Sequence, residues 1–478
     1  MQLPEDFIKQ TEPLFKAGLW HDYVSAFDDR PPVSIRLNPL KVTGMGVSES
    51  LCAGGVPWCT DGIYLTDRPN FTFDPLLHAG LYYVQEASSM FLDRVLRRYV
   101  SDGPVKMLDL CAAPGGKSTV ARAALPAGSL LVSNEPIRSR AQILAENIMK
   151  YGHPDVIVTN NYARDITRSK LMFDVVVADV PCSGEGMFRK DEGAVSEWSV
   201  ANVEKCWRLQ REIITDIWPC LHDGGLLVYS TCTFNTKENE ENVRFICDEL
   251  GAESLPVDID DKWMITGSLL NGFSEPVYRF IPGRTCGEGL FMAVLRKHGS
   301  RQSEPARGKD KKSKRIRNEK SSAVLKADCL QWITTADDYR QVVSDTSVSL
   351  IPKLWSADYD LAAAGLNIMT AGVHAGEIKG RDVNPTQALA LSSVLRLDAF
   401  PAVELDYASA IDYLRREAMA MPEGTPRGHV LVTYKKHPLG FVKNIGNRAN
   451  NLYPAEWKIR SGHTPEGINR VIEWILVK

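Results

Sequence analysis

Along this chain the pattern of apolar and polar residues alternates between one typical of strands and one typical of helices, and this alternation predicts the secondary structure of the central region. Short apolar runs, typical of strands buried on both faces, alternate with longer segments that carry apolar residues at helical spacing. This alternation predicts an α/β fold with a doubly wound, mostly parallel sheet. The strands are expected at 105–110, 130–134, 156–159, 174–179 and 226–231, and the helices from 117 and over 139–151, 197–221 and 238–250.

Other patterns flank this region. Residues 34–41 alternate polar and apolar side chains, which predicts a half-exposed strand with Arg36 and Asn38 on one face. Apolar residues at helical spacing over 81–99 predict a helix, and the Asp-Gly-Gly sequence at 223–225 is expected to end another. Two further apolar runs are expected to pair antiparallel at one edge of the sheet, at 278–281 and 290–295.

A change of composition divides the chain after residue 298. Residues 301–320 carry nine Lys or Arg against three Asp or Glu, with a single large apolar residue. Such a segment cannot form a core, which predicts a basic linker. A solvated spacer and a role in touching RNA both remain open. Apolar periodicity returns at about residue 328 and predicts a further domain.

Composition narrows the class of protein. A chain of 478 residues is too long for one ordinary core and suggests two to four domains. The net charge of −3 means that any nucleic-acid-binding surface must be local. The start of the chain lacks the apolar region of a signal peptide, and no apolar run approaches the roughly 18 residues of a membrane span. The ten cysteines form no CxxC pair, which disfavours zinc and disulfides and leaves thiols free in a reducing cytoplasm.

The turn after the first central strand resembles a nucleoside site. Asp109-Leu-Cys-Ala-Ala-Pro-Gly-Gly-Lys-Ser118 has glycines where a backbone approaches a ligand, and it opens a helix whose N–H groups are free. Glu135, after the second strand, is placed to bind a ribose hydroxyl pair. The turn is not GxGxxG, and a P-loop would need glycine where Cys111 stands. An ordinary structural turn is the alternative.

Two cysteines follow the ends of two further strands. Asp179 ends the fourth strand and Cys182 comes just after it, while Cys232 follows the fifth. Ligands of such sheets bind outside the carboxyl ends of the strands, so both thiols are expected beside the nucleoside pocket. A buried cysteine is ordinarily a small core residue. The same is expected of Cys52, Cys59, Cys206, Cys220, Cys247, Cys286 and Cys329.

One reaction uses two thiols, a carboxylate and a methyl donor. Carbon 5 of cytosine becomes nucleophilic when a thiolate adds at carbon 6. An acid hydrogen-bonded at ring nitrogen 3 stabilises the charge that develops, and a base must then remove the proton from carbon 5 so that the thiol can leave. The residues themselves do not decide which thiol attacks.

Three motifs together resemble the NOL/NOP/Sun family of RNA 5-methylcytosine methyltransferases. They are residues 111–117, 179–186 and 229–233, and the resemblance extends over about 30–298. It implies a class I, Rossmann-like methyltransferase fold that uses S-adenosyl-L-methionine. It also implies Cys232 as the nucleophile, Cys182 as the thiol that assists release, and Asp179 between cofactor and base. The residues implied to hold the cofactor are Cys111, Ala112, Ala113, Pro114, Gly115, Gly116, Lys117, Glu135 and Asp179.

The resemblance has one departure near the adenine side. The family often has an aspartate after the third strand, where this chain has Asn160 and Asn161. One of these side chains, or the backbone beside them, would have to take its place.

The end of the chain resembles the PUA-like RNA-binding tail of bacterial family members that act on the small ribosomal subunit. Residues 440–454 carry the resemblance. Six Lys or Arg and one Glu between Lys435 and Arg460 predict phosphate contacts. Interleaved aromatic residues predict base stacking, and an ordinary solvated face is the alternative. These aromatic residues are Tyr434, Phe441, Tyr453 and Trp457.

These expectations combine into one function. The chain is expected to be an RNA cytosine-C5 methyltransferase acting on 16S rRNA, without a metal or a membrane, as a cytoplasmic monomer with ribosomal RNA or the small ribosomal subunit as partner. A tRNA methyltransferase, a non-catalytic ribosome assembly factor and a P-loop-like NTPase are the alternatives. The expected segments are an α+β N-terminal RNA-binding domain (1–75), the methyltransferase domain (76–298), the basic linker (299–326) and an α+β C-terminal domain with the PUA-like module (327–478).

Overall fold

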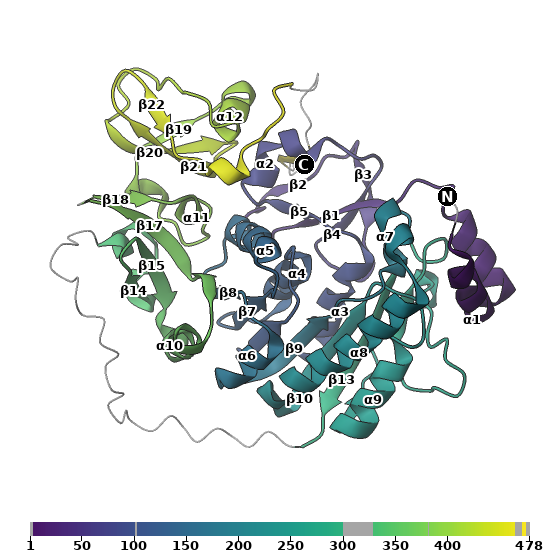
Figure 1. The fold of residues 1–478 in the computed structure, drawn as a ribbon. Coiled ribbons are helices and arrows are strands. Elements are labelled where there is room, and N and C mark those ends of the chain that lie inside the picture. The colour runs from purple at the N-terminus through teal and green to yellow at the C-terminus, as the bar shows by residue number, and fades with distance from the viewer. Residues whose placement is uncertain (1–2, 101–102, 300–327, 381, 464–470, 475–478) are drawn as a thin grey trace, which may run out of the picture.

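A nine-stranded sheet forms the centre of the molecule, in the order β11-β13-β10-β9-β6-β7-β8-β16 with β12 paired to β13 (Figure 1). This computed structural model describes residues 3–100, 103–299, 328–380, 382–463 and 471–474. Strands β6 to β10 run parallel and the others antiparallel, which confirms the doubly wound α/β sheet. The strands are β6 (Lys106–Asp109), β7 (Leu130–Asn134), β8 (Val156–Thr159), β9 (Phe173–Asp179), β10 (Leu221–Thr231), β11 (Ala252–Ser254), β12 (Tyr278–Phe280), β13 (Leu290–Lys297) and β16 (Ile368–Ala371).

Helices cover both faces of this sheet because successive side chains of its strands are apolar on both sides. Met107 packs into the core on one face, with α3, α4 and α5, and its neighbour Leu108 into the core on the other, with α6, α8 and α9. Burial on two faces explains the continuous apolar runs of the sequence. The helices are α3 (Phe91–Tyr99), α4 (Gly116–Ala124), α5 (Arg138–Tyr151), α6 (Ala163–Arg168), α7 (Glu192–Glu197), α8 (Val200–Ile217) and α9 (Glu240–Leu250).

The direction of winding reverses between β6 and β9. From β6 the chain proceeds to β7 and β8 on one side, and then returns to β9 and β10 on the other. A crevice forms outside the carboxyl ends of the strands at such a reversal, and ligands of open α/β sheets bind there.

Three local predictions were wrong. The helix expected over 81–99 begins only at Phe91, because Tyr82–Val84 form a strand, β5. The Asp-Gly-Gly sequence at 223–225 ends no helix; it lies inside β10, where the pairing with β9 shifts register. The strand predicted at 34–41 exists, but Arg36 and Asn38 are buried rather than half-exposed.

The N-terminal region contains a helix and a four-stranded sheet of order β3-β4-β1-β5. The sequence pattern did not reveal the helix, α1, whose largest apolar side chains are aromatic. Phe7, Phe15 and Tyr23 of α1 pack with Phe188 and Phe234, which lie in the loops after the two cysteines. The elements are α1 (Glu5–Ser25), β1 (Val33–Leu37), β2 (Met45–Val47), β3 (Cys52–Gly55), β4 (Gly62–Leu65), α2 (Pro75–His78) and β5 (Tyr82–Val84).

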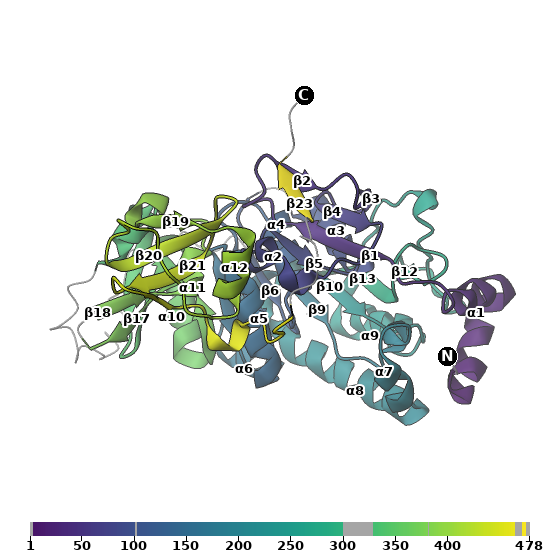
Figure 2. The same ribbon diagram turned by 90° about the horizontal axis from the view of Figure 1, so that it is seen from above.

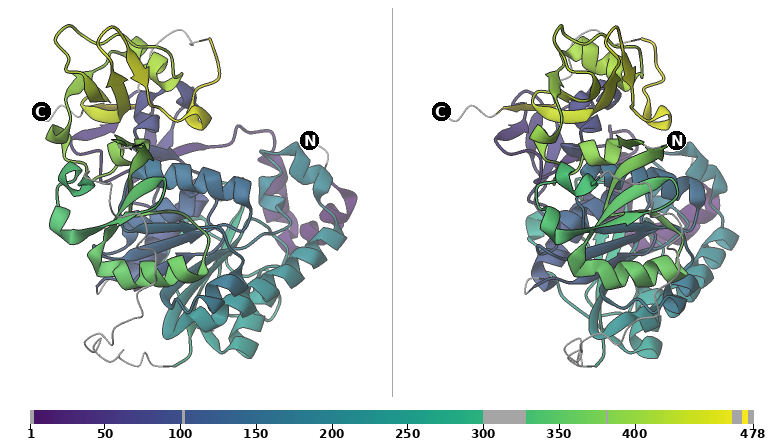
Figure 3. Two further views of the ribbon diagram at one scale, coloured as in Figure 1. Left: turned by 60° about the vertical axis from the view of Figure 1, so that its left-hand side comes forward. Right: turned by 90° about the vertical axis from the view of Figure 1, so that its left-hand side faces the viewer.

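The C-terminal region forms two more four-stranded sheets and supplies β16 to the central sheet. Figure 3 shows its first sheet and α10 along the side of the central sheet. The elements are β14 (Tyr339–Val343), β15 (Ser347–Pro352), α10 (Ser356–Gly365), β17 (Val373–Lys379), β18 (Asp382–Pro385), α11 (Gln387–Ala390), β19 (Ala402–Glu404), α12 (Tyr407–Leu414), β20 (Gly428–Tyr434), β21 (His437–Asn444), β22 (Ala449–Asn451) and β23 (Ile472–Trp474).

The two ends of the chain share a core. Ile35 and Leu81 from the N-terminal region pack in one cluster with Ile411 and Leu414 from α12. Strand β23 pairs with β2. Figure 2 shows β2 beside β23, and α2 beside α12. Apart from Gly299, the basic linker expected over 299–326 lies outside the described residues. No helix in the described ranges is both long and apolar enough to cross a membrane.

Candidate active site

The glycine turn after β6 lies at the carboxyl edge of the sheet, between α5 and β5. Gly115 has φ of 114°, in the left-handed region that favours glycine. A Cβ at Gly116 would lie 3.4 Å from the side chain of Gln85. Neighbouring groups fix the turn, because Asn147 donates to the carbonyl oxygen of Pro114 at 2.8 Å. The turn therefore presents its backbone and the first turn of α4 toward the crevice.

Glu135 follows β7 and is buried, with 1% of its surface exposed. Its Oε1 accepts a hydrogen bond from the backbone N–H of Ile137 at 3.0 Å. Its Oε2 has no hydrogen-bond partner among the described residues, and the nearest cation, Arg140, lies 3.6 Å away. Because a buried carboxylate oxygen that accepts no hydrogen bond is costly, this atom suits a ligand that brings hydroxyl donors.

Asp179 ends β9 and forms an ion pair with Lys117 from α4, with 2.9 Å between Nζ and Oδ2. Its other oxygen accepts a hydrogen bond from Ser230 at 2.7 Å. Burial lowers the pKa of Lys117, but Asp179 outweighs burial and the pKa is raised, so the ammonium stays charged. The sequence placed Lys117 in the cofactor turn; its side chain reaches across the strand ends to Asp179.

Cys182 and Cys232 lie next to each other, with their sulfur atoms 3.1 Å apart. They meet because β9 and β10 are parallel neighbours in which Asp179 pairs with Ser230. The backbone N–H of Cys232 also donates to the Cys182 sulfur at 3.3 Å. The hydrogen bond with Cys232 and burial raise the pKa of the Cys182 thiol well above its usual value. Cys182 is therefore protonated at neutral pH.

Two buried carboxylates join the loops that carry the thiols. Glu238 accepts from the backbone N–H of Ser183 at 3.0 Å, directly after Cys182. Glu185 accepts from the backbone N–H of Phe234 at 2.7 Å and of Asn235 at 3.0 Å, shortly after Cys232. Each loop is thus held by a carboxylate from the other segment.

A shared amide connects these two carboxylates. The side-chain amide of Asn235 donates to Glu238 at 2.8 Å and to Glu185 at 3.0 Å. Burial raises the pKa of Glu238 to about 7. Sequence reasoning assigned no role to Glu185, Glu238 or Asn235. The sequence signal that could have revealed these roles is an acidic residue shortly after each thiol: Glu185 after Cys182 and Glu238 after Cys232.

Gly186 allows the two loops to approach closely. Its N–H donates to the carbonyl oxygen of Cys232 at 2.8 Å. A Cβ at Gly186 would lie 2.8 Å from the Cα of Gly289, which is closer than real Cβ contacts. Glycine is therefore required there, and its backbone fixes the position of Cys232.

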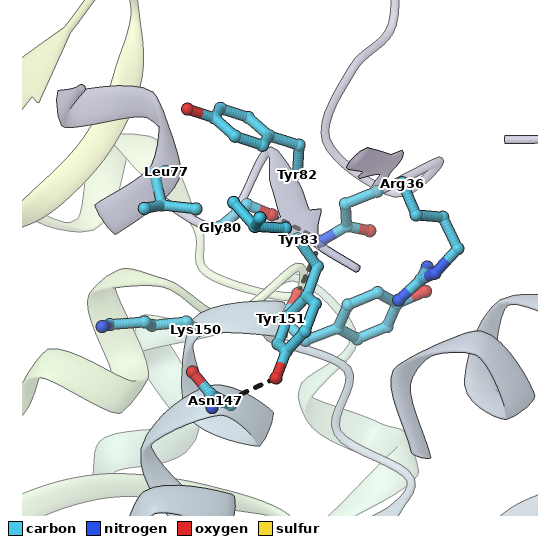
Figure 4. A pocket seen from close by; sticks show the side chains of 10 residues that line it. Arg36, Leu77, Gly80, Tyr82, Tyr83, Asn147, Lys150 and Tyr151 are labelled. Atoms are coloured by element: carbon cyan, nitrogen blue, oxygen red, sulfur yellow. Dashed lines mark hydrogen bonds between the residues drawn. The ribbon is translucent and has the colours of Figure 1, made fainter. Parts of the chain in front are cut away.

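Two cavities open on the N-terminal side of the site. The larger, of about 810 Å³, lies between the N-terminal sheet and the loop after Cys182, and four cations line it: Arg30, Arg68, Arg189 and Lys190. The smaller, of about 190 Å³, lies between β5 and α5 behind the glycine turn (Figure 4). Arg36, Tyr83 and Asn147 line it, and neither thiol does.

The aromatic residues of the C-terminal sheet correct one prediction. Tyr434, Phe441 and Tyr453 are 8%, 1% and 0% exposed, so they pack in the core and cannot stack on RNA bases. Trp457 is half-buried, with the ammonium of Lys150 5.2 Å from its ring centroid. The predicted basic surface remains, since four cations are exposed: Lys436, Arg448, Lys458 and Arg460.

Within the described ranges, no group of three or more His, Cys, Asp or Glu side chains is placed to hold a metal ion.

Known protein families match three stretches of the chain. Residues 101–296 match the 16S rRNA methyltransferase RsmB/F family, residues 3–87 the N-terminal domain of 16S rRNA methyltransferase RsmF, and residues 400–459 the methyltransferase RsmF PUA domain. The match over 3–87 covers the N-terminal region, the match over 101–296 most of the central sheet, and the match over 400–459 the second C-terminal sheet.

Two curated relatives match almost the whole chain. A ribosomal RNA small subunit methyltransferase F from Shigella boydii is 30% identical over 486 residues, 95% of this chain and 96% of the relative. The protein of the same name from Cronobacter sakazakii is 29% identical over 475 residues, with the same coverage. A crystal structure of PH0851 has a TM-score of 0.52 and 24% identity, over 62% of this chain and 66% of that chain, and supports the fold.

Proposed function

Because the chain belongs to the ribosomal RNA small subunit methyltransferase F family, we propose that it methylates carbon 5 of a cytosine in 16S rRNA, with S-adenosylmethionine as methyl donor. As a member of this family the chain is an RNA methyltransferase. The observation that carries the cytosine assignment is the pair of thiols 3.1 Å apart, at neighbouring strand ends. Methyl transfer to an exocyclic nitrogen needs no thiol, whereas carbon 5 of cytosine needs one to become nucleophilic.

The crevice fits the proposed methyl donor. Oε2 of Glu135, which accepts no hydrogen bond from the described residues, would accept from the ribose hydroxyls. The turn at 111–117 would surround the rest of the donor molecule through backbone groups. When bound, S-adenosylmethionine supplies an electrophilic methyl group. Lys117, at the end of this turn, pairs with Asp179, which precedes Cys182 by three residues, so the donor and the base would meet there.

Cys232 is the proposed nucleophile and Cys182 the thiol that assists release. A protonated Cys182 can donate its S–H to the Cys232 sulfur, which stabilises a thiolate on Cys232. Cys232 then adds to carbon 6 of the base and carbon 5 gains the methyl group. Once Cys232 has bonded to the base, Cys182 is free of this contact and would give up its own proton to water. The Cys182 thiolate would then take the proton from carbon 5, the double bond between carbons 5 and 6 would re-form, and Cys232 would leave as a thiolate.

Lys117 and Asp179 are proposed to act on the pyrimidine ring. Their ion pair provides a carboxylate and a charged ammonium at one place, beside Cys232. Negative charge develops toward ring nitrogen 3 and the carbonyl oxygen when the thiolate adds, and a fixed cation there stabilises it.

The RNA is proposed to enter along the N-terminal cavity. Four cations line that cavity, and Arg189 and Lys190 lie in the loop after Cys182. A target base must leave its stack to reach the thiols, and flanking phosphates need cations nearby. The N-terminal region and the exposed cations of the C-terminal sheet would thus both touch RNA in the cytoplasm, and the enzyme would act as a monomer.

A trapped adduct tests the mechanism. Cys182→Ala incubated with 16S rRNA and S-adenosylmethionine is expected to give a covalent protein–RNA band on a denaturing gel, because the proton on carbon 5 stays in place. The double variant Cys182→Ala, Cys232→Ala should give none. An adduct from Cys232→Ala alone would reverse the roles of the thiols.

The substrate and the alternatives are tested separately. Bisulfite sequencing of rRNA and tRNA from a deletion strain should show one or more lost 5-methylcytosines in 16S rRNA. Loss only in tRNA would redirect the substrate. Normal ribosome assembly through a Cys232→Ala allele, but not through a deletion, would point to the assembly-factor function. Calorimetric binding of ATP but not S-adenosylmethionine would point to an NTPase.

A further inference from the structure

A segment of the C-terminal region lies at the carboxyl edge of the central sheet. Strand β16 pairs with β8, with Ile368 opposite Thr159, the last residue of β8. Asn367 precedes β16 and therefore lies beside Asn160 and Asn161, where the family often has an aspartate. The C-terminal region thus reaches the adenine side of the proposed cofactor crevice.

Asn367 is hydrogen-bonded to both asparagines that follow β8. The backbone N–H of Asn160 donates to the carbonyl oxygen of Asn367 at 2.9 Å. The backbone N–H of Asn367 donates to Oδ1 of Asn161 at 3.2 Å. The Asn367 side chain donates to Oδ1 of Asn160 at 3.4 Å. These bonds fix the loop after β8 from outside the methyltransferase domain.

Asn160 passes this constraint on to the backbone of Glu135, whose carboxylate is the proposed ribose contact. Its Nδ2 donates to the carbonyl oxygens of Glu135 at 2.7 Å and of Pro136 at 2.9 Å. The side-chain amide of Asn160 is therefore used on both of its atoms by protein groups. Asn161 is held in turn by Asn134, whose Oδ1 accepts from the Asn161 backbone N–H at 3.1 Å.

The C-terminal segment is anchored firmly enough to act as a fixed support. Asp358 of α10, whose side chain is 3% exposed, pairs with Lys106 of β6 at 3.2 Å. Trp355 donates its indole N–H to the carbonyl oxygen of Gly128 at 2.9 Å. A support attached at three separate places moves with the central sheet rather than independently of it.

We propose that Asn160 and Asn161 are positioning residues through which residues 366–371 hold Glu135 in the geometry that binds the cofactor ribose. The inference rests on the proposed function, because it takes S-adenosylmethionine as the ligand of Glu135. It gives the C-terminal region a role in cofactor affinity, in addition to any contact with RNA.

Binding and kinetics of the full-length protein test the proposal. Loss of the hydrogen bonds that hold the segment around Glu135 should raise the Kd for S-adenosylmethionine about tenfold in Asn160→Ala and about fivefold in Asn161→Ala, measured by calorimetry. Asn161→Asp keeps the oxygen that accepts from Asn367 and should stay within about twofold of wild type. The KM for S-adenosylmethionine should rise in parallel, while kcat and the KM for RNA stay unchanged.

Matched controls separate the possible failures. Asn271→Ala changes an exposed asparagine far along the chain and should bind as wild type. Wild-type affinity in Asn160→Ala and Asn161→Ala, or an equal fall in Asn161→Asp and Asn161→Ala, would overturn the proposal. If Asn160→Ala does not fold, the Asn161 pair alone decides. If wild type itself binds no S-adenosylmethionine, the proposed function fails and not this inference alone.

Discussion

The carboxyl edge of the central sheet and the C-terminal sheet of β19 to β22 use polar and aromatic residues in opposite ways. At the central edge the polar groups are buried and paired with one another, as Glu185, Glu238 and Asn235 are. In the C-terminal sheet the aromatic residues are buried and the cations face water. A buried polar network is costly unless it is complete, so it indicates a site that must hold one geometry. An exposed cation, by contrast, has no fixed protein partner to set its position, so it suits a contact with RNA phosphates that does not require one exact geometry.

This contrast predicts the largest effect at the thiols. Cys232→Ser should lower the rate of methyl transfer by at least about 10³-fold, because a hydroxyl is a far weaker nucleophile at neutral pH. Incorporation of labelled methyl groups into 16S rRNA measures it. Cys206→Ser, at a buried cysteine of α8 outside the site, is the matched control and should keep near wild-type activity. Activity within tenfold of wild type in Cys232→Ser would mean that Cys232 is not the nucleophile of the methyl transfer.

The carboxylates that hold the two loops should come next. Oε2 of Glu185 accepts from both backbone N–H groups, and Oε1 accepts from the side chains of Asn235 and Trp198. Gln has a single accepting oxygen, so Glu185→Gln leaves one of these two pairs of donors facing an NH2 group, which costs about 1–3 kcal/mol. We expect kcat to fall by about ten- to hundredfold and Tm to fall as well. Glu192→Gln changes an exposed residue of α7 and should alter neither. An unchanged kcat in Glu185→Gln would mean that the loops keep their geometry without this carboxylate.

The pH dependence of stability should report the burial of Glu238. Burial raises the pKa of Glu238 from 4.5 to about 7, so the folded state keeps a proton that the unfolded state gives up. Stability contributed by this group is therefore lost as pH rises from about 4.5 to about 7, by on the order of 3 kcal/mol.

Chemical denaturation across this pH window measures the effect. Glu238→Gln has no proton to lose, so the difference between the two proteins isolates Glu238 from the buried histidines. A constant difference between pH 5 and pH 8 would contradict the raised pKa.

The core of the C-terminal region should affect stability without affecting RNA binding. Tyr453→Phe removes a hydroxyl that is hydrogen-bonded to His78 at 3.2 Å, which should cost about 1 kcal/mol. RNA affinity should stay within twofold of wild type, because the ring is fully buried. A loss of RNA affinity larger than the change in stability explains would restore the base-stacking role that the sequence suggested.

The smallest expected effect belongs to the exposed cations. Arg448→Ala should weaken RNA binding only two- to fivefold and make the slope of log K against log salt less negative by about 0.7, for one lost phosphate contact on a single strand. Filter binding over a range of salt measures both. Glu456→Ala removes a charge of the opposite sign from the same exposed region and, since an acid makes no phosphate contact, should leave the slope unchanged. An unchanged slope in Arg448→Ala would remove that residue from the RNA surface.

The sequence predicted the central edge better than its surroundings for a physical reason. Carboxyl ends of neighbouring parallel strands meet at one edge, so a residue just past each apolar run has a predictable place. That rule brought Asp179, Cys182 and Cys232 together correctly. It carries no information about residues whose partners are distant in the sequence. The hydrogen bonds from Asn160 to Asn367 and from Phe234 to Glu185 were therefore not foreseen.

Composition misled where the same residue types serve two purposes. Aromatic residues between cations suit RNA, but they are also the bulkiest fillers for a small β core, and burial decided for the core. The strand β5 was taken for a helix because Tyr82–Val84 precede the helical residues without a clear stop. The helix α1 was missed because its aromatic side chains bury against loops rather than against a regular face.

The position of β16 at the edge of the central sheet has a consequence for the order in which the protein forms. Strands β6 to β10 and β13 are synthesised first, but β8 remains an open edge until residues 368–371 have been made. An open, apolar edge strand can pair with other chains. During translation the methyltransferase domain therefore exists for a time as an incomplete sheet, and the arrival of β16 both ends that exposure and sets the loop beside the cofactor crevice.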